Sequence, residues 1–275
     1  MKFKLLASVA FAALAAVSGS ASAGLLWGNN ASAFGVIEAV DQTTLAVVHQ
    51  YAIGPGNGRS VVTVGDIVYY TFVGDSHIYK LDANTGASLG SINTTVASMS
   101  TLGWDGSQFW TSDYAGTNQA FRIDTTGAVT KTITLGLASG GTDGMEYFNG
   151  KLIANRCDAC GVYDIYDLDG NVLVSNFINT GASATGIAFD GTDFLLSNIF
   201  ANSITKYDGT TGALISTNFI GGPVPATGVG QRLWEDLSVD YAARQDTGGV
   251  PEPTPLLLVG IAVLGLVASQ RKRAR

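Results

Sequence analysis

The chain has few of the residues on which most enzyme sites depend. Its 275 residues include two His, two Cys and three Met, which leaves little material for general-base or metal chemistry. It has no G-x-S-x-G nucleophile elbow and no glycine loop with phosphate-binding spacing between a strand and a helix. The sequence therefore names no catalytic constellation, although sites assembled from scattered loops carry no such motif.

Basic residues and glutamate are also scarce. Residues 24–249 contain nine Lys and Arg against 21 Asp and Glu, a net charge of −12, and 18 of these 21 acids are Asp. An acidic surface repels phosphate backbones, so nucleic acid is excluded as a partner. Asp favours turns, and together with 35 Gly and abundant Thr, Val and Ile the composition predicts an all-β fold.

The first 23 residues have the pattern of a cleaved secretory signal peptide. Two lysines precede an apolar run over residues 5–17, and Ala21-Ser22-Ala23 provides an A-x-A cleavage site. The run is shorter than the roughly 20 residues of a membrane-spanning helix. We therefore expect signal peptidase to process the chain, and the exported protein to begin at Gly24.

Both cysteines lie in one C-x-x-C pair, Cys157 and Cys160. An exported protein meets an oxidising compartment, so we predict a local disulfide between them. The same spacing occurs in redox and zinc sites, which stay open as alternatives, although zinc would need two further ligands.

Self-similarity along the chain is its strongest structural signal. An alternating strand that ends at a turn aspartate recurs five times, and we assign these turn residues as Asp41, Asp82, Asp124, Asp169 and Asp208. Successive members of this series are about 40 residues apart, and such a period with strand-and-turn content predicts β-propeller blades.

A second recurring element supplies the other half of each blade. It consists of an apolar strand, a D-G or N-G hairpin turn and another apolar strand, as in residues 102–112, 144–155 and 186–198. Two strands here and two around the turn aspartate make a four-stranded blade. The N-terminal copy, residues 25–30, lacks its innermost strand, whereas residues 233–240 form a strand with no partners after it.

Placing this last strand in the first blade closes a ring of five four-stranded blades over residues 24–247 and removes exposed sheet edges. A six-bladed ring and a two-domain sandwich are the alternatives. The repeats resemble the NHL, streptogramin-lyase and glutamine-cyclotransferase propellers in two features, G-(hydrophobic)-x-x-D-G and a strand followed by D-x-x-T-G. The resemblance implies the fold and no catalytic residue.

The C-terminal residues 248–275 have three parts in a specific order. Val250-Pro251-Glu252-Pro253 comes first, then an apolar segment over 256–269 that we expect to be transmembrane, then a basic cluster over 271–275. This order resembles the PEP-CTERM sorting signal of Gram-negative bacteria. The resemblance implies removal of the tail by the membrane protease exosortase, a destination in the cell envelope or extracellular matrix, and a link to exopolysaccharide and biofilm. A plain C-terminal membrane anchor is the alternative.

Propeller ligands usually lie over the central channel, so the polar residues expected there are candidates for ligand binding. They are Asp113, Tyr114, Asp143, Glu146, Arg156, Asn198, Arg232, Trp234, Glu235 and Asp236. Converging carboxylates would suit calcium, and no other cofactor is expected; the alternative is that these residues are solvated loop ends. The four tryptophans are candidates for stacking on sugar rings, against the commoner role of packing between sheets.

These features favour an exported, non-enzymatic surface or matrix protein that binds a glycan or a surface protein through its propeller. The alternative is an extracytoplasmic, cation-dependent lyase or hydrolase with a site over the channel. A third hypothesis is a mainly structural component of the matrix.

Overall fold

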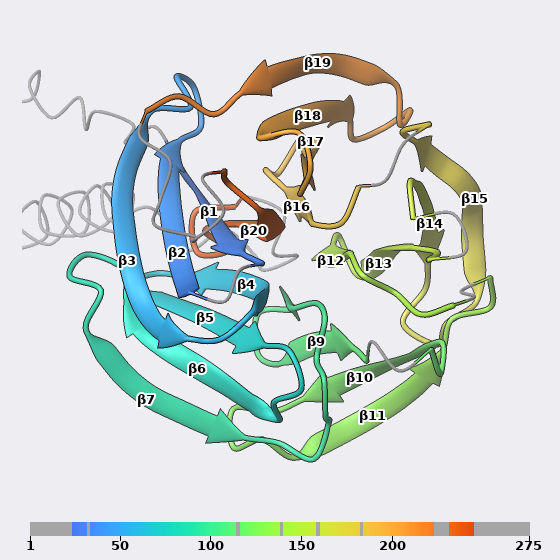
Figure 1. Cartoon of the computed structure of the whole chain (residues 1–275). Coiled ribbons are helices and arrows are strands. Elements are labelled where there is room, and N and C mark those ends of the chain that lie inside the picture. Colours follow the sequence, from blue (N-terminus) through green and yellow to red (C-terminus); the bar gives the residue numbers. More distant parts are fainter. Residues whose placement is uncertain are drawn as a thin grey trace, which may run out of the picture.

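The computed structural model describes residues 24–31, 34–113, 116–137, 140–157, 160–181, 184–222 and 231–244. Within these ranges every regular element is a strand. Twenty strands form five four-stranded antiparallel sheets arranged around a common axis (Figure 1). The predicted five-bladed propeller is confirmed, and the six-bladed and sandwich alternatives are wrong.

The blades are numbered I to V from the N-terminus, and the strands of each follow from the axis outward. Blade I contains β20 (Trp234–Val239), β1 (Leu25–Asn30), β2 (Phe34–Asp41) and β3 (Val47–Pro55). Blade II contains β4 (Gly58–Val64), β5 (Ile67–Phe72), β6 (His77–Asp82) and β7 (Ser88–Asn93). Blade III contains β8 (Gly103–Trp104), β9 (Phe109–Ser112), β10 (Gln119–Ile123) and β11 (Val129–Thr134). Blade IV contains β12 (Met145–Phe148), β13 (Lys151–Asn155), β14 (Val162–Tyr166) and β15 (Val172–Asn179). Blade V contains β16 (Ile187–Phe189), β17 (Asp193–Asn198), β18 (Ser203–Asp208) and β19 (Leu214–Phe219).

The ring closes where the sequence predicts. Strand β20 pairs antiparallel with β1, with Trp27 opposite Ser238, and so supplies the innermost strand that blade I lacks. In Figure 1 the red β20 lies beside the blue β1 near the axis, although the two strands are the last and the first of the propeller. Because the ring is closed, every blade has a neighbouring blade on both sides.

One hydrophobic cluster fills each of the five interfaces between blades. Between blades IV and V, for example, Phe148 and Phe194 meet edge to face with ring centroids 4.9 Å apart. Trp27, Trp110 and Trp234 are buried, and Trp104 packs against Phe109. The tryptophans therefore pack between sheets, which confirms the commoner of their two expected roles.

The turn aspartates cap the hairpins between third and fourth strands, with one correction. Asp82 Oδ1 accepts hydrogen bonds from the backbone N–H groups of Asn84 and Thr85, which is the expected local capping. In blade IV this role belongs to Asp167, because β14 ends at Tyr166 and the turn starts at once. The predicted Asp169 instead pairs with Lys131 across the blade boundary at 2.6 Å. With Asp167 in the series the five turn aspartates are more evenly spaced, so the repeat is more regular than the sequence suggested.

The two targeting segments lie outside the described residues. These are the signal peptide 1–23 and the tail 248–275 with its motif Val250-Pro251-Glu252-Pro253, and both stay predictions. Among the residues that the structure does describe, no helix is long and apolar enough to cross a membrane.

Candidate functional site

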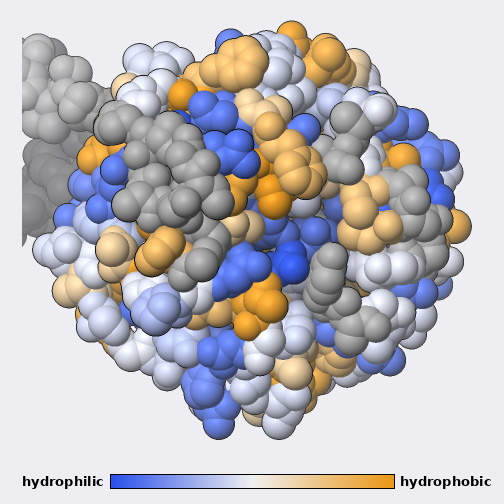
Figure 2. Space-filling model, in the orientation of Figure 1, coloured by the Kyte–Doolittle hydropathy of each residue, from blue (hydrophilic) through white to orange (hydrophobic). Residues whose placement is uncertain are grey.

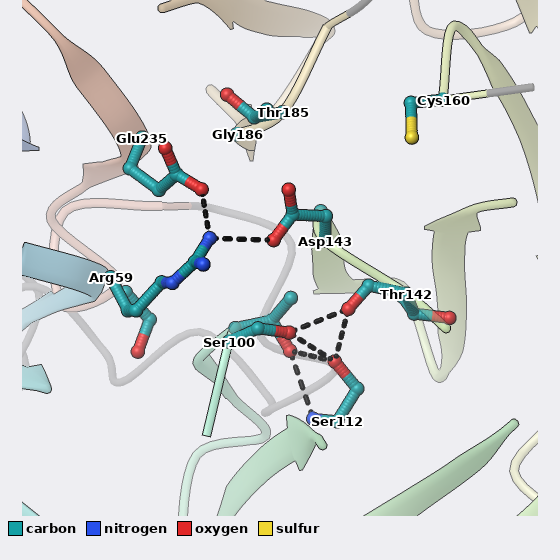
Figure 3. Close-up of polar contacts among 12 residues, drawn as sticks. Arg59, Ser100, Ser112, Thr142, Asp143, Cys160, Thr185, Gly186 and Glu235 are labelled. Atoms are coloured by element: carbon teal, nitrogen blue, oxygen red, sulfur yellow. Dashed lines mark hydrogen bonds and ion pairs between the residues drawn. The ribbon is translucent and has the colours of Figure 1, made fainter. Parts of the chain in front are cut away.

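The axis of the ring is occupied by an ion-pair cluster rather than by an open row of loop ends. Arg59, at the start of β4, lies between Asp143, just before β12, and Glu235, in β20 (Figure 3). Its Nη1 is 3.2 Å from Asp143 Oδ1 and also donates to Glu235 Oε1. The Arg59 side chain is 14% exposed and both carboxylates are buried. Three blades thus contribute one charged side chain each to the same point.

A bulge in β20 aims Glu235 at this point. Asn29 is opposite Asp236 and Asn30 is opposite Trp234, so Glu235 has no partner on β1. A bulged residue is turned out of the alternation of its strand. Its two neighbours take the sheet positions: Trp234 packs in the cluster between blades V and I, and Asp236 Oδ2 accepts the N–H of Val61 at 3.1 Å.

Burial raises the pKa of both carboxyls and so favours their protonated forms. Burial, reinforced by the nearby charge of Asp143, raises the pKa of Glu235 from 4.5 to about 7. Burial also raises the pKa of Asp143, against the attraction of Arg59. One guanidinium faces two carboxylates, so the cluster carries an excess negative charge that a single proton removes.

A second buried ion pair lies further along β12. Arg244, in the turn after β20, donates through Nη2 to Glu146 Oε1 and through Nη1 to the carbonyl oxygen of Tyr147. Its guanidinium also lies 3.6 Å from the ring centroid of Tyr241. Burial raises the pKa of Glu146 to about 7 even though Arg244 opposes the change.

These carboxylates do not fit a calcium site. The guanidinium of Arg59 already lies between Asp143 and Glu235, where a bridging cation would have to bind. Across the described part of the chain, no group of three or more His, Cys, Asp or Glu side chains is arranged to hold a metal ion.

Two predicted ligand residues instead lock the closing strand. The buried carboxylate of Glu38 on β2 accepts hydrogen bonds from Arg232 Nε and from the indole N–H of Trp234, both at 2.9 Å. Asn30 and Gln50 donate to the same carboxylate. Arg232 and Trp234 therefore fasten β20 to the N-terminal strands.

The remaining predicted residues are dispersed. Asp113 accepts from the Thr117 hydroxyl, Arg156 pairs with Asp164 at 3.0 Å on the outer side of blade IV, and Asn198 caps the turn that follows it through the N–H of Phe200. Tyr114 lies outside the described residues. Of the ten candidates, the structure gathers Asp143, Glu146, Glu235 and Asp236 near the axis and places the other described ones elsewhere.

Sequence reasoning missed Arg59 and also a belt of small polar residues that links the blades. The belt residue is at or near the end of each second strand: Asn29, Thr71, Ser112, Asn155 and Ser197. Four of them donate to a backbone carbonyl of the next blade, as Ser112 does to Thr142 at 3.0 Å, whereas Ser197 accepts from Gly186 in its own blade. Their recurrence at nearly even intervals, one in each repeat, was the available signal.

Cys157 and Cys160 are free, partly buried thiols, and Cys157 lies close to Asp143 of the ion-pair cluster. Burial, together with Cys160 and the charge of Asp143, raises the pKa of the Cys157 thiol. A thiol that stays protonated is a poor nucleophile, and the redox and zinc alternatives stay open beside the disulfide. The disulfide is not formed in this structure and stays a prediction for the protein in an oxidising compartment.

Comparison with known proteins identifies the fold and no family. No protein-family model matches the chain, and no curated protein matches it. Among solved structures, a chain of a nidogen/laminin complex is similar with a TM-score of 0.52 and 12% identity, covering 80% of this chain and 98% of that one. Glutaminyl cyclase of Myxococcus xanthus aligns with a TM-score of 0.49 and 12% identity over 59% of this chain and 70% of that one. The first likeness agrees with the propeller described above.

Proposed function

We propose that this protein is an exported, exosortase-processed component of the cell surface or extracellular matrix of a Gram-negative bacterium. Its propeller binds a glycan or another protein without converting it. The targeting half of this proposal rests on the patterns at residues 1–23 and 248–275. The binding half rests on the fold and on the axial cluster.

The single observation that carries the binding role is the position of Arg59 between Asp143 and Glu235. Carboxylates that are held by a guanidinium inside the ring are not free to polarise a substrate or to hold a catalytic cation. Recognition then falls to the outer faces and rims of the blades. Figure 2 shows hydrophilic side chains over the middle of one face and separate apolar patches around them.

The alternative, an extracytoplasmic lyase or hydrolase, has one observation in its favour. A carboxyl with a pKa of about 7, as burial gives Glu235, is in the range that a general acid requires. If this residue were catalytic, Glu235→Gln would abolish turnover of a polysaccharide while leaving its binding intact.

The test uses the full-length chain secreted by its host. Cell fractionation, N-terminal sequencing and intact mass determine whether processing yields Gly24 at one end and removes the tail at the other. Extracted exopolysaccharide is then incubated with the protein. Retention without loss of polymer length supports the proposal, and depolymerisation that depends on Glu235 overturns it in favour of the alternative. Retention of a matrix protein in place of glycan keeps the binding role and changes the partner class.

A further inference from the structure

Blades IV and V carry most of the large apolar side chains that are exposed in the described chain. Seven of the twelve large hydrophobic residues that are exposed in the described chain belong to these two blades: Val172, Leu173, Val174, Phe200, Leu214, Ile215 and Phe219. Phe200 and Phe219 are 75% and 72% exposed. Large apolar side chains that gather on one exposed surface are typical of a binding site.

One of these residues, Leu214, lines a groove between blades IV and V. Its volume is about 180 Å³, and it is lined by Thr180, Ala184, Leu196, Ser197, Asn198, Thr205, Tyr207, Leu214 and Thr217. Thr205 and Thr217 are opposite each other on β18 and β19, with their hydroxyls 3.2 Å apart. Since alternate residues of a strand share a face, Phe219 lies on the same face as Thr217, two residues further along.

The groove carries no charge, although the domain around it is strongly acidic. The lining combines hydroxyls and an amide with one buried aromatic residue and one exposed leucine, and none of the nine residues is ionisable near neutral pH. Hydroxyl and amide partners above an apolar floor suit a ligand that has both polar edges and apolar faces. The volume lies below the roughly 300–1,000 Å³ of sites for drug-sized ligands, so one ring-sized unit of a longer chain fits there.

The equivalent groove between blades II and III shows what is particular to this one. Phe121 and Thr132 are opposite each other there as Thr205 and Thr217 are here. Asp113 stands where blade V has Asn198, and Thr134 stands where blade V has Phe219. The two grooves therefore have the same backbone arrangement. The groove between blades II and III has a carboxylate, whereas the groove between blades IV and V has an amide in its place and an exposed aromatic ring.

We propose that the groove between blades IV and V binds a neutral glycan, with one sugar unit between Thr205, Thr217 and Asn198 and the next against Phe219. This inference rests on the proposed binding function and names its site and ligand class. The acidic domain repels uronate or sulfate polymers, whereas the uncharged groove accepts neutral ones. An aromatic face covers the apolar side of a sugar ring, and hydroxyl side chains replace the water that its edges lose.

The test is calorimetric titration of the full-length, detergent-solubilised protein with short neutral gluco-oligosaccharides and N-acetylglucosamine oligomers, and with oligogalacturonate as the acidic counterpart. We expect binding of a neutral oligomer with an affinity that changes little with salt, because no ion pair is involved. Phe219→Ala and Thr217→Val should each weaken it by about tenfold. Thr134→Ala, the matched change in blade III, should leave it as in the unmodified protein, and circular dichroism confirms that all variants are folded.

The outcomes separate the two proposals. If Phe219→Ala and Thr217→Val leave neutral-glycan binding unchanged, the groove is not the binding site, whereas the proposed function stands. Preference for the acidic oligomer overturns the ligand class. Failure to bind any glycan overturns the glycan proposal, and binding of a matrix protein that Phe219→Ala weakens assigns the surface to a protein.

Discussion

Replacing Arg59 with Met tests whether the axial cluster is a compensated ion-pair network. The change keeps the aliphatic stem and removes the guanidinium, which leaves Asp143 and Glu235 buried and unpaired. Removing one partner of a buried pair costs about 3–5 kcal/mol of folding stability. The Arg59 guanidinium opposes the rise in the pKa of Glu235 that burial and Asp143 cause, so its removal should raise this pKa further.

The loss should depend on pH in a defined direction. Folding raises the pKa values of Asp143 and Glu235. Their contribution to the free energy of unfolding is therefore fully present below the unfolded-state pKa and is lost as the pH rises through the folded-state pKa. The unmodified protein should therefore lose stability between about pH 4.5 and about pH 7. In the Arg59→Met variant the loss should be largest near pH 8 and about 2 kcal/mol smaller near pH 5, where protonation removes a charge.

Urea unfolding followed by tryptophan fluorescence measures both quantities, because Trp27, Trp110 and Trp234 are buried in the folded ring. Lys131→Met is the control, since its pair with Asp169 is exposed and should contribute at most about 1 kcal/mol. Arg59→Met combined with Glu235→Gln should regain stability at pH 8. A variant as stable as the unmodified protein at pH 8, or equally weakened at both pH values, would refute the reasoning.

Four further outcomes are expected. Glu38→Ala leaves the guanidinium of Arg232 buried without its carboxylate and should lower the free energy of unfolding by about 3–5 kcal/mol in urea melts. Gly28→Ala places a Cβ 2.1 Å from the Trp234 ring and should cost about 1–3 kcal/mol, whereas Gly136→Ala, with 3.4 Å to its nearest neighbour, should be nearly neutral. Deleting residues 248–275 should leave the thermal midpoint unchanged, while truncation before Trp234 should abolish cooperative unfolding because blade I loses β20. Unreduced mass spectrometry of the exported protein should show the loss of about two hydrogens across Cys157 and Cys160, and a fully reduced pair would contradict the predicted disulfide.

Most of the fold could be predicted because its determinants are local and repeated. Hairpin turns such as Asn149-Gly150, whose φ values are +45° and +74°, specify strand pairing within a few residues. The misassigned turn at Asp169 shows the limit of this reasoning, since two nearby aspartates both fit the pattern. Only the end of β14 at Tyr166 decides for Asp167.

The candidate site was far less predictable, because its members meet only through the ring. Arg59 lies 84 residues from Asp143 and 176 residues from Glu235. No local pattern distinguishes it from the other basic residues. Trp234 and Arg232 illustrate the converse, since they have the chemistry of ligand-binding residues and serve closure instead.

The sequence by itself determined the five blades, the four strands of each and the strand that completes the first blade, because turn chemistry and alternation act between neighbours in the chain. The tertiary structure alone decided which charged side chains pair at the axis, which blades are linked by the polar belt and which groove is left uncharged at the surface. Those relations depend on the closing of β20 against β1, which brings β4, β12 and β20 together at one point and sets the spacing of the blades.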